Sequence, residues 1–314
     1  MEMNVLSLFD GMSCGQIALQ KLGIKVDNYF ACEIDKYAIQ VTQNNFPDTI
    51  QLGDVQFVTK QTLGNHKIDL ILGGSPCQGF SFAGKNLNFQ DPRSALFFEF
   101  VRLVKELKPK YFLLENVRMK KESRDIISEY MGCEPIEINS ALMSAQNRRR
   151  LYWTNIPGVT QPEDKGIVLK DILESEFDKL MDISGDIQKP INPNSTNQIN
   201  PDKSAKSKSS DEKGTQPHMQ DRVFDIRGKS HALTASFANH TNVGKIKADA
   251  AQKDNVLAKD KLYWRKLTPI ECERLQTVPD NYTDCVSNTQ RYKMLGNGWT
   301  VDVVAHILKG INIS

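Results

Sequence analysis

The chain has 314 residues, of which 39% are hydrophobic and 25% are charged, and its formal net charge at pH 7 is +2. These values are ordinary for a globular protein with one large domain, or with a large and a small one. No apolar run approaches the roughly 18 residues of a membrane span, and the N-terminus lacks the basic start of a signal peptide, so we expect a cytoplasmic protein without membrane contact.

Strand and helix patterns alternate over residues 1–155. Helical patterns lie at 15–22, 36–45, 94–107 and 121–131. Apolar runs between them predict strands at 3–9, 27–32, 49–52, 68–73, 110–115, 134–140 and 150–155. Such alternation is typical of an α/β fold with a doubly wound, mostly parallel sheet.

Glycines and acidic residues follow the first three predicted strands. Gly11 and Gly15 lie where the first helix begins, and glycines there let a ligand approach the backbone. Glu33 ends the second strand, where a carboxylate can bind ribose hydroxyls, and Asp54 follows the third. These positions favour a cofactor that contains adenosine. A nicotinamide cofactor stays open, and a plain strand-to-helix turn is the alternative for the first of these segments.

One cysteine lies on a tight turn directly after a strand. Residues 74–81 read Gly-Ser-Pro-Cys-Gln-Gly-Phe-Ser, and they place Cys77 beyond the end of the apolar run 68–73. In open α/β sheets the reacting groups gather beyond the carboxyl ends of the strands, so Cys77 is a candidate nucleophile. The other five cysteines form no Cys-x-x-Cys pair and lack zinc spacing with the histidines, so we expect free thiols and no metal site.

Two further segments carry candidate catalytic groups. Glu115 ends the apolar run 110–115, where it can face Cys77 from a neighbouring strand and donate a proton. Residues 146–150 read Gln-Asn-Arg-Arg-Arg, and in a strand Arg148 and Arg150 would point to one face. Guanidinium groups on one face suit a carbonyl oxygen, a carboxylate or phosphates. A capping glutamate and a solvated basic edge are the plainer alternatives.

The rest of the chain divides at about residue 267. Residues 156–266 have irregular patterning and include a polar, low-complexity loop at about 185–217, which predicts a smaller, irregular domain. Residues 201–266 hold 14 Lys and Arg against 8 Asp and Glu, as expected either of a surface facing a phosphate backbone or of a solvated loop. Thr268, Pro269 and Glu271 form a capping box that opens a helix at 269–276, and further helices are predicted at 288–295 and 300–309.

Taken together, these segments resemble the DNA cytosine-5 methyltransferase family. The similarity comes as ordered blocks over nearly all the chain outside 156–264, and Pro-Cys-Gln at 76–78, Glu-Asn-Val at 115–117 and Gln-x-Arg-x-Arg at 146–150 are the most specific. The first block, at 9–15, and the Gly-Trp-Thr-Val segment at 298–301 look like the animal de novo branch of the family. The glutamine after Cys77 and the asparagine at 297 are as in bacterial and phage enzymes, so we expect a prokaryotic or phage type.

The resemblance implies a reaction, a cofactor and a set of site residues. The reaction is methyl transfer from S-adenosylmethionine to C5 of a flipped-out cytosine in duplex DNA, through a covalent bond between Cys77 and C6. It implies Cys77, Glu115, Arg148 and Arg150 as catalytic residues and no metal. The implied cofactor contacts are Phe9, Asp10, Gly11, Gly15, Glu33, Ile34, Asp54, Val55, Pro76, Leu96, Asn297, Gly298 and Trp299.

The resemblance also implies a domain organisation and partners. Residues 1–155 would form the first part of the catalytic and cofactor-binding domain, 156–266 a target-recognition domain, and 267–314 helices returning to the catalytic domain. We expect a monomer that binds double-stranded DNA in a prokaryotic or phage-infected cell. It would be paired with a restriction endonuclease, as in a restriction-modification system, or would protect viral DNA.

Three alternatives stay open. A related enzyme could methylate transfer RNA, although its relatives carry a Cys-Phe-Thr signature that this chain lacks. A catalytically silent DNA-binding relative would not need Cys77, Glu115 and Arg150. A nicotinamide dehydrogenase would explain the sheet but neither Pro-Cys-Gln nor the arginine cluster.

Overall fold

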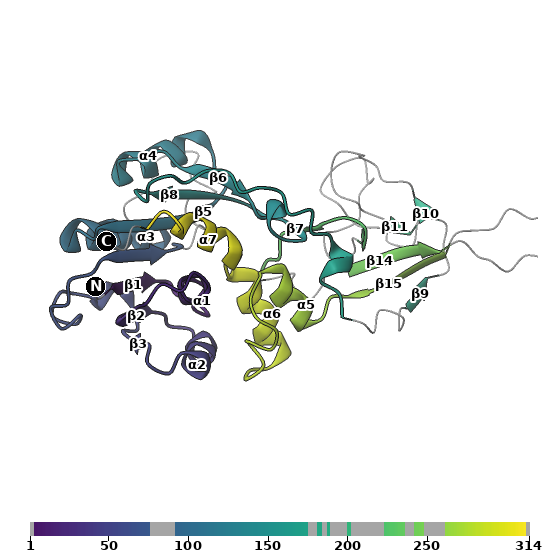
Figure 1. Ribbon diagram of the computed structural model, residues 1–314, viewed down its shortest axis with the longest axis horizontal. Helices are drawn as coiled ribbons and strands as arrows, with labels where there is room; N and C mark the ends of the chain where they lie inside the picture. Colours follow the sequence, from purple (N-terminus) through teal and green to yellow (C-terminus); the bar gives the residue numbers. More distant parts are fainter. Residues whose placement is uncertain are drawn as a thin grey trace, which may run out of the picture. The chain divides into compact units, whose positions relative to one another are not determined.

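The structure is a computed structural model of the chain. It describes residues 3–75, 92–174, 181–183, 187–188, 200–201, 223–235, 242–247 and 261–311. Pro76, Cys77 and most of the predicted loop at 185–217 lie outside these ranges. The chain divides into two compact units, of which unit 1 comprises 1–139, 149–162 and 298–314, and unit 2 comprises 140–148 and 163–297 (Figure 1).

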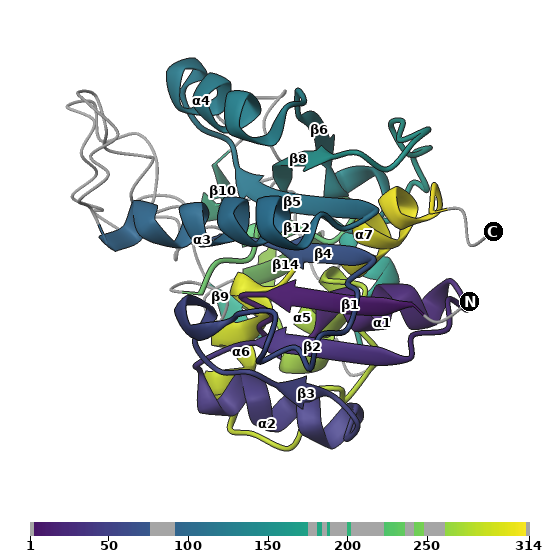
Figure 2. The ribbon, with the colours of Figure 1, turned by 90° about the vertical axis from the view of Figure 1, so that its left-hand side faces the viewer.

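Unit 1 is built on a sheet whose strand order is β3-β2-β1-β4-β5-β8-β6, visible from bottom to top in Figure 2. Pairing is parallel from β3 to β5, whereas β8 runs antiparallel to both β5 and β6. The strands are β1 (Asn4–Leu8), β2 (Asn28–Cys32), β3 (Ile50–Gln51), β4 (Leu70–Gly73), β5 (Tyr111–Val117), β6 (Ile136–Asn139) and β8 (Arg149–Thr154). The predicted doubly wound, mostly parallel sheet is therefore confirmed.

Helices cover both faces of this sheet. They are α1 (Cys14–Lys21), α2 (Lys36–Asn45), α3 (Pro92–Leu107), α4 (Lys121–Met131) and α7 (Val301–Leu308), with a 3₁₀ helix at Val55–Phe57. On one face, side chains of α3 and α4 such as Phe97, Phe100 and Ile127 join a buried cluster with Leu6 and Trp153 from the strands. On the other face α1 packs against α7. Side chains that alternate along each strand thus feed two separate cores.

Local signals fix where the helices of unit 1 begin and end. Asp35 precedes α2, and its carboxylate accepts a hydrogen bond from the Tyr37 amide at 3.0 Å. The helix α4 ends at Gly132, whose φ of 70° is a left-handed conformation that glycine adopts without strain. Both helices have the bounds that the sequence predicts.

Unit 2 contains a second, smaller sheet with strand order β12-β14-β15-β9, and two short strand pairs, β10-β11 and β13-β7. Its helices are α5 (Pro269–Leu275) and α6 (Asn288–Asn297), with 3₁₀ helices at Ser140–Leu142 and Leu169–Asp171. Its strands are β7 (Gln146–Asn147), β9 (Met181–Ile183), β10 (Ile187–Gln188), β11 (Asn200–Pro201), β12 (Val223–Asp225), β13 (Ser230–His231), β14 (Asn242–Lys247) and β15 (Lys261–Lys266).

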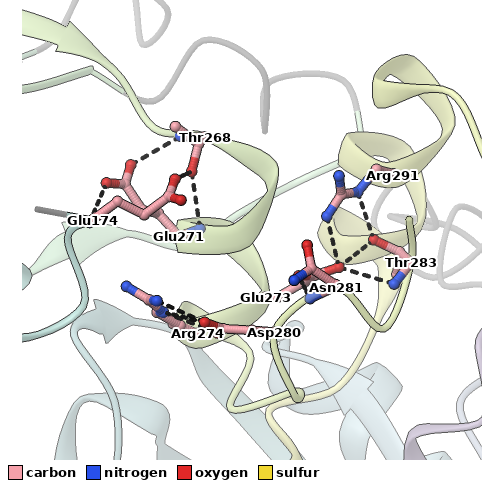
Figure 3. A network of polar contacts seen from close by, with 9 residues as sticks. All are labelled: Glu174, Thr268, Glu271, Glu273, Arg274, Asp280, Asn281, Thr283 and Arg291. Carbon is pink, nitrogen blue, oxygen red and sulfur yellow. Dashed lines mark hydrogen bonds and ion pairs between the residues drawn. The ribbon is translucent and has the colours of Figure 1, made fainter. Parts of the chain in front are cut away.

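Two buried glutamates of α5 organise the polar network in Figure 3. Glu271 completes the predicted capping box by accepting from the Thr268 amide, and it pairs with both terminal nitrogens of Arg265 at 2.6 and 2.7 Å. Glu273 accepts hydrogen bonds from the backbone amides of Asn281 and Thr283 (Figure 3). Both carboxylates are fully buried. These hydrogen bonds and ion pairs offset the free-energy cost of removing the two charges from water.

The division into units differs from the predicted domain boundaries at three places. Residues 156–162, predicted to begin the target-recognition domain, belong to unit 1. Residues 140–148 and 267–297, which the sequence assigned to the catalytic domain, belong to unit 2. Side chains explain this: Gln146 donates to the Leu275 carbonyl at 2.7 Å, and Ser144 donates to the same carbonyl. Such hydrogen bonds join segments about 130 residues apart, and no local sequence pattern reports them.

Candidate catalytic and cofactor site

The register of unit 1 brings the predicted site segments to one edge of the sheet. Leu8 pairs with Cys32 on one side and with Gly73 on the other, and Gly73 pairs with Leu114. The residues that follow are Phe9, Glu33, Gly74 and Glu115. They therefore lie at the same level of the sheet, at the carboxyl ends of parallel strands. This is the edge where open α/β sheets bind their ligands.

The loop between β1 and α1 has an unusual backbone. Phe9, Gly11 and Ser13 have φ values of 58°, 59° and 64°, and only the glycine adopts such a conformation without strain. Asp10 lies between them and accepts hydrogen bonds from the Ser13 hydroxyl at 2.7 Å and the Tyr29 hydroxyl at 2.9 Å. Strain held in place by a hydrogen-bonded carboxylate is typical of a preorganised functional loop.

The electrostatics of this loop centre on Asp10. Burial raises the pKa of Asp10 from 3.8 to about 6, with a smaller contribution from the negative charge of Glu33, although the hydrogen bonds with Ser7, Ser13 and Tyr29 oppose the rise. The pKa of Tyr29 is also raised, by burial and by the charge of Asp10. Sequence reasoning missed Ser13 and Tyr29. Tyr29 stands inside an apolar strand, and nothing local signals its contact with Asp10.

Glu33 and Asp54 are held by backbone amides. One Glu33 oxygen accepts from the Gly11 amide at 2.8 Å, and the other from the amides of Ile34 and Asp35, both at 2.8 Å. Asp54 caps the 3₁₀ helix by accepting from the Gln56 amide at 3.0 Å. Both carboxylates are thereby fixed at the ends of β2 and β3, and their remaining lone pairs can accept from a ligand.

Apolar residues lie beside these carboxylates. Ile34, which follows Glu33, is 77% exposed, an unusual state for a large aliphatic side chain at a strand end. Val55 is buried, and Leu96 and Phe9 are partly buried against the core. Gly15 lies in the first turn of α1, where a Cβ atom would stand 2.6 Å from a methyl carbon of Leu72, so only glycine lets the helix approach β4.

Glu115 is the centre of the candidate catalytic group. It is 8% exposed, and its Oε1 atom lies 2.9 Å from Nε of Arg150 in an ion pair. The other oxygen, Oε2, accepts from the indole Nε1 of Trp299 at 3.1 Å. The structure thus brings together Glu115, Arg150 and Trp299, of which the resemblance had placed Trp299 with the cofactor.

Arg148 has different surroundings. It belongs to unit 2, is 3% exposed, and donates to the carbonyls of Leu233 at 2.6 Å and Gly296 at 3.4 Å. These two hydrogen bonds direct its guanidinium to backbone carbonyls of unit 2. Asn297 ends α6 in unit 2, whereas Gly298 and Trp299 begin the last segment of unit 1.

Four of the described cysteines have thiols that are hard to ionise. Burial raises the pKa of Cys32 to about 12 and also raises the pKa values of Cys133, Cys272 and Cys285. These thiols therefore stay protonated at neutral pH and are poor nucleophiles. Cys77, the candidate from the sequence, lies outside the described residues, as does Pro76.

The described ranges also bear on membrane and metal binding. No helix among these residues is long and apolar enough to cross a membrane. No group of three or more His, Cys, Asp and Glu side chains in the same ranges could hold a metal ion.

Comparisons with known proteins agree with the geometry. The family model described as C-5 cytosine-specific DNA methylase matches residues 3–312. The type II methyltransferase M1.ScrFI of Lactococcus lactis subsp. cremoris is 30% identical, over 96% of this chain and 75% of that protein. The type II methyltransferase M.HhaI of Haemophilus parahaemolyticus is 28% identical, over 98% and 94%. The crystal structure of the Dnmt2 methyltransferase of S. pombe shares the fold, with a TM-score of 0.66 at 19% identity over 98% of this chain and 99% of that one.

Proposed function

The chain belongs to the C-5 cytosine-specific DNA methylase family, and from this premise we propose that it methylates C5 of a cytosine flipped out of a specific sequence in duplex DNA. The methyl group comes from S-adenosylmethionine, and a covalent bond between Cys77 and C6 of the cytosine forms on the way. The observation that carries the proposal is Glu115, held by Arg150 and lying beside the strand end that leads to Cys77.

The chemistry of cytosine explains the need for a thiol. C5 is a poor nucleophile, and addition of the Cys77 thiolate to C6 makes the ring an enamine that attacks an electrophilic methyl carbon through C5. Loss of the C5 proton to a base then restores the double bond and expels the thiolate. An ordinary cysteine with a pKa near 8.5 is only a few per cent thiolate at pH 7, so a site of this kind must favour the thiolate.

Glu115 and Arg150 are proposed to hold the base. A carboxylate offers about four lone-pair positions, and Arg150 and Trp299 each occupy one, on different oxygens. The exocyclic amino group of cytosine can donate to one of the remaining positions, and a protonated Glu115 carboxyl can donate its proton to N3. Arg150 can donate its other N–H groups to the O2 carbonyl. Arg148 is proposed to support the site from its buried position, through the backbone carbonyls that it binds.

The family uses S-adenosylmethionine, and the described residues fit it. When bound, it supplies an electrophilic methyl group. We propose that Glu33 binds the ribose hydroxyls and that Asp54 accepts from the adenine amino group. The exposed face of Ile34 suits an aromatic base, and the other proposed contacts are Phe9, Asp10, Gly11, Gly15, Val55, Pro76, Leu96, Asn297 and Gly298.

Unit 2 is proposed to recognise the DNA. The chemistry cannot reach a cytosine inside a stacked duplex, so the base must be flipped out at a cost of a few kcal/mol. The basic balance of residues 201–266 suits a surface that contacts phosphates. We propose that the protein acts as a monomer in the cytoplasm of a bacterial or phage-infected cell, without a metal, and is paired with a restriction endonuclease or protects viral DNA.

One assay tests the activity directly. Purified protein is incubated with S-adenosylmethionine labelled in the methyl group and, in separate reactions, with duplex DNA of mixed sequence or with transfer RNA, and the products are analysed for 5-methylcytosine. Transfer to DNA is expected, and Cys77→Ala should abolish it while leaving cofactor binding intact. Labelling of transfer RNA alone would favour the related RNA enzyme, and cofactor binding without any transfer would favour a catalytically silent relative.

A further inference from the structure

Two donors hold the carboxylate of Glu115, one on each oxygen. Nε of Arg150 lies 2.9 Å from Oε1, and Nε1 of Trp299 lies 3.1 Å from Oε2. The donors come from different parts of the fold, because Arg150 belongs to β8 whereas Trp299 lies just before α7. With one oxygen fixed by each donor, the carboxylate cannot rotate about its Cγ–Cδ bond without breaking a hydrogen bond.

The backbone beside the indole leaves room for this contact. A Cβ atom at Gly74 would lie 2.9 Å from Nε1 of Trp299 and 3.0 Å from Oε2 of Glu115, so only glycine lets the two groups meet at this point. The far edge of the ring reaches the start of α1, where a Cβ atom at Gly15 would lie 3.8 Å from Cζ3. The indole thus extends from the catalytic carboxylate to the first turn of α1.

We propose that Trp299 is a positioning residue for Glu115. Its indole N–H donates and cannot accept, so it fixes one lone pair of Oε2 and directs the others toward the target base. The resemblance placed Trp299 among the cofactor contacts, whereas its hydrogen bond assigns it to the carboxylate that holds the cytosine. This inference rests on the proposed function.

The variant Trp299→Phe keeps the ring and removes the donor. Hydrogen bonds to charged groups are worth enough to change a rate by about 10- to 100-fold, and we expect kcat for methyl transfer to fall by at least about 10-fold. The dissociation constant for S-adenosylmethionine, measured by calorimetry, should stay within about twofold of wild type. Calorimetric binding also shows that the variant is folded.

A second readout separates the base from the cofactor. Without the methyl donor, addition of Cys77 to C6 lets C5 take a proton from water, and loss of the original hydrogen followed by expulsion of the thiolate restores cytosine. Release of tritium from DNA labelled at C5 of cytosine measures this exchange, which needs Glu115 but no donor. Trp299→Phe should slow the exchange by the same factor as methyl transfer.

Trp153→Phe is the matched control. Trp153 is fully buried in unit 1, and its Nε1 donates to the Ser128 hydroxyl at 3.0 Å, so the control also loses one indole hydrogen bond. It should leave both rates unchanged. Gly74→Ala disturbs the contact between Trp299 and Glu115 from a second position, because its Cβ would press on both the indole nitrogen and Oε2, and it should slow the exchange as well.

Each outcome decides a different point. Normal exchange in Trp299→Phe together with weakened donor binding would overturn the inference and make Trp299 a cofactor contact. Wild-type behaviour in both assays would also overturn it. If Trp299→Phe did not fold, normal exchange in Gly74→Ala would contradict the inference, and slowed exchange would support it. Failure of the wild-type protein in both assays would instead reject the proposed function.

Discussion

Replacing Asp10 by asparagine tests whether the loop between β1 and α1 holds a carboxylate at a cost in stability. Asp10 accepts hydrogen bonds from the hydroxyls of Ser13 and Tyr29. Burial nevertheless raises its pKa from 3.8 to about 6, with help from the charge of Glu33. The folded protein therefore binds a proton at Asp10 more tightly than the unfolded chain does.

The magnitude and sign follow from this difference. A tenfold change in proton affinity is worth about 1.4 kcal/mol, so the rise from 3.8 to about 6 corresponds to about 3 kcal/mol. Since the folded-state pKa is the higher one, the free energy of unfolding falls as the pH rises from about 4 to about 6 and then levels off. Asparagine cannot ionise, so the Asp10→Asn variant does not show this loss. Its free energy of unfolding therefore increases relative to that of wild type as the pH rises.

Urea unfolding of both proteins at pH 4.5, 5.5, 6.5 and 7.5 measures the effect. The stability of Asp10→Asn relative to wild type should increase by about 2 kcal/mol between the lowest and highest pH. Groups other than Asp10 titrate in both proteins and cancel in the comparison. A difference that stays constant across this range would refute the claim that Asp10 is buried at an electrostatic cost.

Further predictions concern the same loop and the network of unit 2. Affinity for S-adenosylmethionine should weaken as the pH falls through about 6, because protonated Asp10 no longer attracts the positive charge of this cofactor. Calorimetry with wild type and Asp10→Asn checks this prediction, and an equal pH dependence of the two affinities would contradict it. Glu273→Gln should lower the free energy of unfolding by about 3–5 kcal/mol, since it leaves the buried Arg291 without its ion-pair partner at 3.0 Å. Asp280→Asn removes a half-exposed ion pair with Arg274 and should cost less than about 1 kcal/mol; equal losses in the two variants would show that burial does not set the cost.

The sequence determined most of the fold of unit 1. The amphipathic spacing of 94–107 gave a helix observed at Pro92–Leu107, and the alternation of strands and helices led to the observed parallel sheet. It also placed Glu33 and Glu115 at the same edge, because residues after neighbouring parallel strands must share it. These features could be predicted because periodicity, caps and strand ends are local properties of a chain.

The sequence by itself thus determined the family, the sheet and the edge where the candidate site lies, whereas tertiary structure decided how the side chains of that site are held. The partners of Asp10 and Glu115 are Tyr29 and Trp299, which lie 19 and 184 residues away along the chain. Similarly, Arg148 and Arg150, two residues apart, have separate partners, because Arg148 binds carbonyls of unit 2 and Arg150 pairs with Glu115. The physical reason is that hydrogen bonds and ion pairs depend on distances in space, which packing of the whole fold sets and no local pattern encodes.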